Sequence, residues 1–230
     1  MDYYAIAKKA SSQIAGHPGL EFLKSQCTDG KKILDVGCGE GTRLNTMLPE
    51  KNRGWGIDPS PQAIALAKTQ YPRHYFKVGT GEKLPFANNY FDLVYSAFAI
   101  EHCQNPQQFI KEMIRVTKKG GQIVILAPNY GAPNRRSPVT TELPINKFFE
   151  GLIKDFFPPP NLSWTEVTPK STYHHIDDDT SWEPYLFSLR RYLTFNHVTI
   201  QQCNSLWSLE PKNEEFRKLV IGKLGQFGIW

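Results

Sequence analysis

The sequence predicts an α/β fold in which a doubly wound, mostly parallel sheet carries helices on both faces. Two observations lead to this prediction. Short apolar runs alternate with segments of helical periodicity over residues 1–130, as in sheets built from strand–helix–strand units. The first of these runs stops at a cluster of glycines, as a buried parallel strand does before a turn. The length of 230 residues suits one large domain, or one domain with an elaboration.

The expected elements of the first half follow one another at regular spacing. We expect strands at residues 32–36, 54–58, 75–78, 91–96 and 123–127. Helices are expected over residues 42–48, from Pro61, and from Pro106 to a closing turn at residues 118–121. Pro59-Ser60-Pro61 is expected to open the second of these helices, and Asn105-Pro106 to cap the third.

The pattern changes after Ala127. Seven prolines fall between residues 131 and 170, which disfavours regular strands there. Residues 145–157 nevertheless place apolar side chains on one helix face, and three prolines end the run. A helix from Pro184, a strand at residues 197–200 and a helix from Pro211 to about Leu224 are expected to follow.

Composition excludes several classes of protein. No apolar run approaches the ~20 residues that span a bilayer, and residues 1–5 lack a signal-peptide pattern, so we expect a cytoplasmic protein without a transmembrane segment. The four cysteines form no Cys-x-x-Cys pair, which disfavours a zinc ribbon or disulfide scaffold. The net charge of +5 is spread over separate lysine pairs rather than a stripe, which disfavours a nucleic-acid partner.

The strongest motif is the glycine turn over residues 35–41, Asp-Val-Gly-Cys-Gly-Glu-Gly. Glycines there let the backbone approach a ligand closely. The dinucleotide pattern G-x-G-x-x-G would need a third glycine where Thr42 stands, and the phosphate-loop Gly-Lys-Ser/Thr is missing. Asp58 lies 21 residues after Gly37 and ends the second expected strand. A carboxylate at that point can accept hydrogen bonds from both ribose hydroxyls.

On these residues the sequence resembles the class I S-adenosylmethionine-dependent methyltransferases. Residues 33–41 match that family's glycine motif, and residues 79–86 resemble its Gly-Asp-Ala-Glu-x-Leu-Pro-Phe segment. Further matches lie at residues 91–94, at the Glu-His signature of residues 100–102, and at residues 112–121. The resemblance covers residues 31–128 closely and implies a Rossmann-like sheet.

The resemblance also implies S-adenosylmethionine as the cofactor and a set of residues that hold it. Thr80 departs from the family pattern, because an acidic residue usually accepts from the adenine amine there. The implied cofactor-binding residues are Asp35, Gly37, Cys38 and Gly39 near the methionine part, Asp58 on the ribose, Pro59 beside the adenine, Thr80, Gly81 and Glu82 at the adenine edge, and Ala97.

His102 and Glu101 are the candidate catalytic residues, since a neutral imidazole near the acceptor could remove its proton. The alternative is a histidine that is hydrogen-bonded only to backbone. No metal site is expected, because a solvated loop suits the two histidines and three aspartates of residues 174–179 better than a chelating cluster. For the apolar face of residues 145–157, packing on the sheet or over the acceptor site is favoured over a dimer face or membrane contact.

These inferences lead to one predicted function and two alternatives. We expect methyl transfer to a small-molecule acceptor by in-line displacement, with a non-catalytic S-adenosylmethionine-binding protein or an NAD-dependent oxidoreductase as alternatives. The whole chain, 1–230, is expected to form one methyltransferase domain. Within it we expect a cofactor-binding part (1–129), an inserted acceptor-side cap after the fifth strand (130–183) and a C-terminal α/β completion (184–230) whose last strand is short or truncated.

Overall fold

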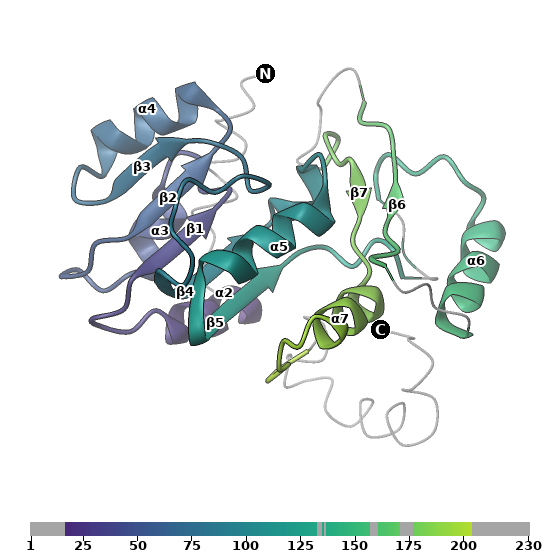
Figure 1. Cartoon of the computed structure of the whole chain (residues 1–230). Helices are drawn as coiled ribbons and strands as arrows, with labels where there is room; N and C mark the ends of the chain where they lie inside the picture. Colours follow the sequence, from purple (N-terminus) through teal and green to yellow (C-terminus); the bar gives the residue numbers. More distant parts are fainter. Residues whose placement is uncertain (1–16, 133–134, 136, 157–160, 171–176, 204–230) are drawn as a thin grey trace. The chain divides into compact units, whose positions relative to one another are not determined.

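A computed structural model describes residues 17–132, 135, 137–156, 161–170 and 177–203 (Figure 1). The chain separates into two compact units, residues 1–127 and residues 128–230. Each unit is described by itself.

The first unit is built on a five-stranded sheet in the order β3-β2-β1-β4-β5, and all its pairings are parallel. The predicted doubly wound α/β fold is therefore confirmed. The chain leaves β1 toward one edge and later returns to β4 on the other side, so the connectivity reverses between these two strands. Ligands of such sheets bind beyond the carboxyl ends of the strands at this reversal. The strands are β1 (Ile33–Val36), β2 (Trp55–Asp58), β3 (Tyr75–Val78), β4 (Phe91–Ala97) and β5 (Thr117–Leu126).

Helices cover both faces of this sheet. One apolar cluster joins Leu23, Leu44 and Ile64, from α2, α3 and α4, to sheet residues that include Ile33. Helix α5 contributes nothing to that cluster and lies on the other face, where its own apolar stripe is buried (Figure 1). The helices are α2 (Pro18–Gln26), α3 (Thr42–Met47), α4 (Pro61–Gln70) and α5 (Pro106–Val116).

The cap predicted at Asn105 is confirmed, and Ser60 caps α4 in the same way. The Ser60 hydroxyl accepts from the Ala63 backbone N–H at 3.2 Å, and the Asn105 side chain accepts from the Gln108 N–H at 3.0 Å. Each bond satisfies one of the donors that the first turn of a helix leaves without a partner.

The fifth strand begins earlier than predicted, at Thr117 instead of residue 123. Thr117 pairs with Phe91, but Leu93 pairs with Gln122, so residues 118–121 form an irregular insertion in the ladder. The Lys-Lys-Gly-Gly segment is therefore a strand irregularity and not the closing turn of a helix. Gly120, with φ 76°, supplies the left-handed backbone that the irregularity needs.

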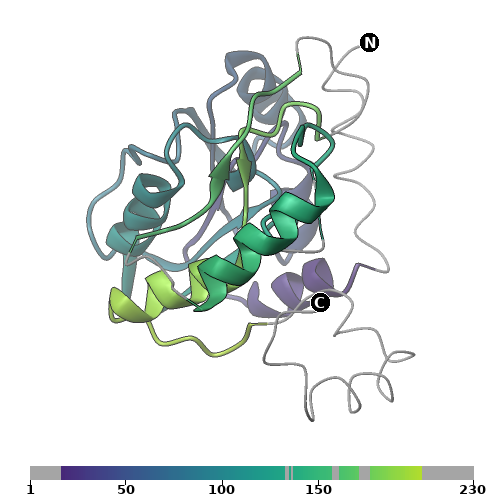
Figure 2. The ribbon, with the colours of Figure 1, turned by 90° about the vertical axis from the view of Figure 1, so that its right-hand side faces the viewer.

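The second unit contains α6 (Pro144–Phe156), the antiparallel pair β6 (Thr165–Glu166) and β7 (Trp182–Glu183), and α7 (Leu186–Phe195) (Figure 2). The strand predicted at residues 197–200 is wrong, because that segment pairs with no strand among the described residues. His197 adopts a left-handed φ of 59°, and the Val198 N–H returns to the Leu193 carbonyl at 2.9 Å. This closes the end of α7 instead of starting a strand. The helix predicted from Pro211 lies outside the described residues.

None of the helices in the described ranges is long and apolar enough to cross a membrane.

Candidate functional site

The glycine turn links β1 to α3 at the carboxyl edge of the sheet. Gly37, Gly39 and Gly41 have φ values of 85°, 54° and 85°, which side chains rarely adopt. A Cβ on Gly37 would lie 2.3 Å from the Cβ of Ala99, whereas a Cβ on Gly39 would meet no atom within 4 Å. The turn is therefore packed against the segment after β4 at Gly37 and open at Gly39.

Asp58 ends β2 directly beside this turn. Its Oδ2 accepts from the Gly39 backbone N–H and its Oδ1 from the Ser60 N–H, both at 2.9 Å. Burial raises the pKa of this carboxyl, although the two backbone hydrogen bonds oppose the shift. Each oxygen has a second lone pair, so the carboxylate can hold the glycine turn and still accept from a ligand.

Asp35 lies beneath the turn instead of lining an open surface. Its side chain is fully buried, and the Tyr95 hydroxyl donates to its Oδ2 at 2.9 Å. Burial raises its pKa to about 7, against the opposing effects of the Arg43 charge and the Tyr95 hydrogen bond. Oδ1 has no hydrogen-bond partner in the described part of the chain. The position fits a polar group that supports a ligand-binding turn from below.

The sequence analysis missed a cluster around the end of β4. Arg43, in the first turn of α3, donates to the carbonyl of the fully buried Ala97 at 2.6 Å and lies 5.6 Å from the Phe98 ring centroid. Phe98 has a left-handed φ of 56°, and His17 meets its ring edge-on at 5.4 Å. Strained backbone of this kind persists only where its surroundings hold it. The only sequence signal is the place of Arg43 just after the glycine turn.

The loop after β3 carries the residues expected at the adenine edge. A Cβ on Gly81 would lie 2.1 Å from the Phe109 ring, so this loop is packed tightly on α5. Thr80 and Pro59 are exposed. The carboxylate of Glu82 accepts from the backbone N–H groups of Gln104 and Asn105 at 2.8 and 3.2 Å. Glu82 thus fixes its loop to the start of α5.

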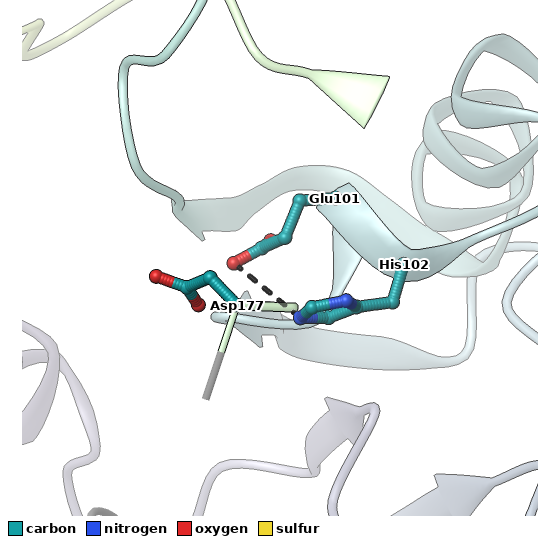
Figure 3. A group of neighbouring side chains, drawn as sticks. All are labelled: Glu101, His102 and Asp177. Atoms are coloured by element: carbon teal, nitrogen blue, oxygen red, sulfur yellow. Dashed lines mark ion pairs between the residues drawn. The ribbon is translucent and has the colours of Figure 1, made fainter. Parts of the chain in front are cut away.

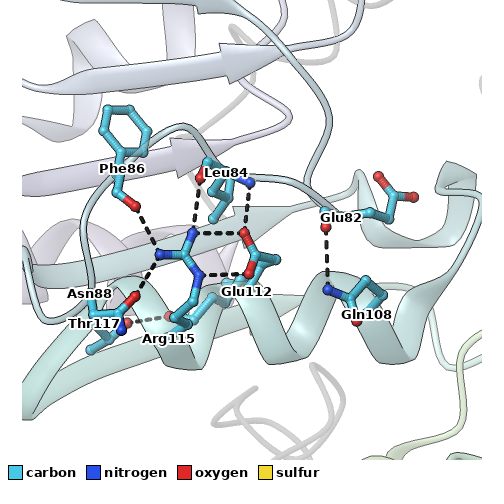
Figure 4. A network of polar contacts seen from close by, with 9 residues as sticks. Glu82, Leu84, Phe86, Asn88, Gln108, Glu112, Arg115 and Thr117 are labelled. Atoms are coloured by element: carbon cyan, nitrogen blue, oxygen red, sulfur yellow. Dashed lines mark hydrogen bonds and ion pairs between the residues drawn. The ribbon is translucent and has the colours of Figure 1, made fainter.

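A second set of contacts holds the continuation of this loop (Figure 4). Arg115 donates to the carbonyls of Leu84 and Phe86 at 2.9 and 2.8 Å and to the side chain of Asn88 at 2.8 Å. Glu112 pairs with Arg115 and accepts from the Leu84 N–H at 2.8 Å. The Arg115 hydrogen bond lowers the pKa of Glu112, although burial opposes it. The network holds residues 84–88 against α5.

The Glu-His pair occupies a short 3-10 turn (Ile100–His102) after β4. The Glu101 side chain is fully buried, and its Oε1 lies 3.9 Å from Nε2 of His102, whose side chain is 21% exposed (Figure 3). A buried carboxylate beside an imidazole can stabilise the protonated ring. The neighbouring Cys103 does not suit a nucleophile, because burial raises the pKa of its thiol well above the ordinary range.

Cys38 is likewise a buried packing residue. Burial raises the pKa of its thiol, and the nearby Asp35 and Asp58 charges add to the shift. A Cβ on Gly56 would lie 2.7 Å from its sulfur, so the side chain fills the space under the turn. Of the histidines and aspartates predicted to form a solvated loop, residues 174–176 lie outside the described part of the chain.

The residues present fit S-adenosylmethionine. The turn is open at Gly39, the carboxylate of Asp58 keeps free lone pairs, and the exposed Thr80 and Pro59 border the same edge of the sheet. Thr42, which starts α3, stands where the dinucleotide motif has its third glycine, so the turn departs from that motif. The arrangement suits a nucleoside ligand without phosphate.

Comparisons with known proteins agree with this geometry. Residues 34–125 match the family model described as a methyltransferase domain. The YcgJ protein from Bacillus subtilis has the same fold, with a TM-score of 0.56 and 20% identity over 78% of this chain and 68% of that one. Residues 34–125 are therefore similar to a methyltransferase domain, and the fold agrees with that likeness.

Two curated relatives illustrate the range of named activities. A demethylmenaquinone methyltransferase from Chlorobaculum parvum is 34% identical over 123 residues, which cover 53% of this chain and 46% of that protein. The ajmaline N-methyltransferase from Rauvolfia serpentina is 38% identical over 104 residues, covering 42% and 36%. The chain thus matches about half, or less, of the length of these relatives.

Proposed function

We propose that the protein transfers a methyl group from S-adenosylmethionine to a small-molecule acceptor. The proposal depends mainly on one observation. The Asp58 carboxylate is hydrogen-bonded to the open glycine turn, at the point where the connectivity of the sheet reverses. Relatives named for a quinone precursor and an alkaloid support small molecules as the acceptor class. We further propose that residues 130–183 form the acceptor-side part and that the protein works in the cytoplasm.

The chain's own residues have three tasks in this proposal. The backbone of the glycine turn, together with Asp58, holds the cofactor, and the buried Asp35 supports the turn. When bound, the cofactor supplies a methyl carbon on a positively charged sulfur. In-line displacement at such a carbon needs mainly orientation and exclusion of water.

His102 is proposed as the base for an acceptor that carries an O–H or N–H group. Its Nε2 would take the acceptor's proton as the acceptor heteroatom bonds to the methyl carbon. Glu101, 3.9 Å away and fully buried, would stabilise the resulting imidazolium. The test is His102→Gln with Glu101→Gln beside it. Both should lower kcat by about 10²-fold or more and leave the affinity for S-adenosylhomocysteine unchanged. A normal kcat in His102→Gln would refute the role.

Ligand-induced stabilisation separates the proposed cofactor from the oxidoreductase alternative. S-adenosylhomocysteine at 100 times its Kd should stabilise the fold by about 2.7 kcal/mol, and NAD should not. The opposite result would refute the assignment.

The ribose contact of Asp58 needs a sharper test, because the side chain also holds Gly39 and Ser60. Calorimetry should compare S-adenosylhomocysteine with its 2′-deoxy analogue on the native protein and on Asp58→Asn. The native protein should prefer the hydroxylated ligand about tenfold or more, and the variant should lose most of that preference. Equal preferences in both proteins would contradict the ribose role.

A catalytic protein is distinguished from a non-catalytic binder by product formation. The protein should be incubated with methyl-labelled cofactor and a small-molecule fraction of a cell extract. A labelled product that is absent with His102→Gln supports catalysis and gives the acceptor class. Tight S-adenosylhomocysteine binding without any product over a broad set of acceptors favours the binder.

A further inference from the structure

Helix α6 presents an apolar face outward from the second unit. The six large apolar side chains of this face are between 42% and 64% exposed. Two of them, Phe148 and Phe149, pack edge to face at 5.9 Å, so the surface is continuous at its centre. The outer face of α6 consists of Leu143, Ile145, Phe148, Phe149, Ile153 and Phe156.

The side of α6 that carries Lys147 and Gly151 is the buried side. Lys147 is 6% exposed and forms an ion pair with Glu183 of β7, which is 1% exposed. The Thr140 hydroxyl and the Ser137 N–H also donate to that carboxylate. Burial raises the pKa of Glu183, but these partners lower it by more, so the net shift is downward. Removal of one partner of a buried ion pair strongly destabilises a fold. The Lys147–Glu183 pair therefore holds α6 with its apolar face outward.

The size of the outer face indicates what can cover it. At roughly 150–250 Å² for a fully exposed aromatic side chain, and about the lower end of that range for leucine and isoleucine, its six residues expose about 600 Å². That is at the upper end for the largest apolar patch of a monomer, about 300–600 Å². Two copies of the face packed together would remove about 1,200 Å², which exceeds the roughly 1,000 Å² expected of a specific interface.

We propose that the outer face of α6 binds the same face of a second copy of this chain. Twofold pairing places the two helices, each about 20 Å long, side by side with Phe149 near the axis. Glu142 and Glu150 are exposed in the same stretch of chain, and the polar rim of a protein interface would keep them in water.

The experiment measures the oligomeric state of the full chain by sedimentation over a range of concentrations. The native protein should be a dimer, and Phe149→Glu and Ile153→Glu should each raise the dimer dissociation constant more than about tenfold, because symmetry brings two carboxylates together. Leu66→Glu is the matched control, since Leu66 is a 44% exposed apolar residue on α4 in the other unit. It should leave the dissociation constant unchanged.

A cross-link tests the geometry without introducing charge. Phe149→Cys should form a disulfide-linked dimer under mild oxidation, whereas the native chain and Leu66→Cys should not. A native monomer at all concentrations, a dimer unaffected by both glutamate variants, or flotation of the native protein with anionic vesicles would each overturn the proposal. None of these experiments measures methyl transfer. A result that overturns the dimer proposal would therefore leave the proposed function untouched.

Discussion

The buried carboxyl of Asp35 gives the protein a stability that depends on pH in a defined direction. Its pKa is raised by burial from 3.8 to about 7 in the folded chain. The folded state therefore binds the proton more tightly than the unfolded state. As pH rises from about 4 to about 7, the free energy of unfolding must fall, and above the folded pKa this contribution stays constant.

The size of the effect follows from the two pKa values. A difference of about 3 units at 1.36 kcal/mol for each unit corresponds to about 4 kcal/mol. Asp35→Asn removes the titration but keeps an oxygen that can accept from the Tyr95 hydroxyl. The variant should match the native protein near pH 4 and become more stable than it as pH approaches 8.

Urea unfolding of both proteins between pH 4 and 8 measures this difference directly. Asp92→Asn is the control whose titration lies below this range. Burial raises the pKa of Asp92, but the Lys118 ion pair and the Lys32 N–H lower it more, so the net shift from 3.8 is downward. The stabilisation by Asp92 is complete above its unfolded pKa, so the difference between Asp92→Asn and the native protein should stay constant from pH 4 to 8. A difference between Asp35→Asn and the native protein that is the same at every pH would refute the reasoning.

Substitutions at four further residues probe the loops of the site. Gly37→Ala should weaken S-adenosylhomocysteine binding at least tenfold, because its Cβ would lie 2.3 Å from that of Ala99. Gly39 also has a left-handed φ, but a Cβ there would meet open space. Calorimetry on Gly39→Ala should therefore show only the ~1–2 kcal/mol that alanine loses in this backbone conformation. Glu82→Ala should destabilise the fold by ~1–3 kcal/mol and Glu82→Gln by less, since Gln keeps an acceptor for the N–H groups at the start of α5. If Gln instead weakens cofactor affinity at unchanged stability, Glu82 contacts the ligand. Arg115→Lys should lower the free energy of unfolding by ~1–3 kcal/mol, because an ammonium cannot replace the fork of donors that holds residues 84–88; an unchanged urea midpoint would contradict this.

Local patterns predicted the elements of the first unit well. The strand at residues 75–78 and the cap at Asn105 depend on neighbouring residues alone, and the structure confirms them. The start of β5 was missed because Thr117 is recruited by its long-range pairing with Phe91. The strand expected at residues 197–200 was wrong for the converse reason, since an apolar alternation makes a strand only where a neighbouring strand is available.

The residues of the candidate site also fall into two groups, those that local sequence predicted and those that only tertiary contacts placed. The sequence by itself determined the glycine turn, the position of Asp58 and the alternation of strands and helices, because backbone conformation and periodicity act between near neighbours. Only the tertiary structure decided that the buried Asp35 accepts from the Tyr95 hydroxyl, that Arg43 binds the carbonyl at the end of β4, and that Glu82 binds the start of α5. The orientation of α6 belongs to the second group. The sequence predicts an apolar helix face, but the buried Lys147–Glu183 pair decides that this face points outward. Such contacts join residues tens of positions apart, and no local pattern records which partners the fold brings together.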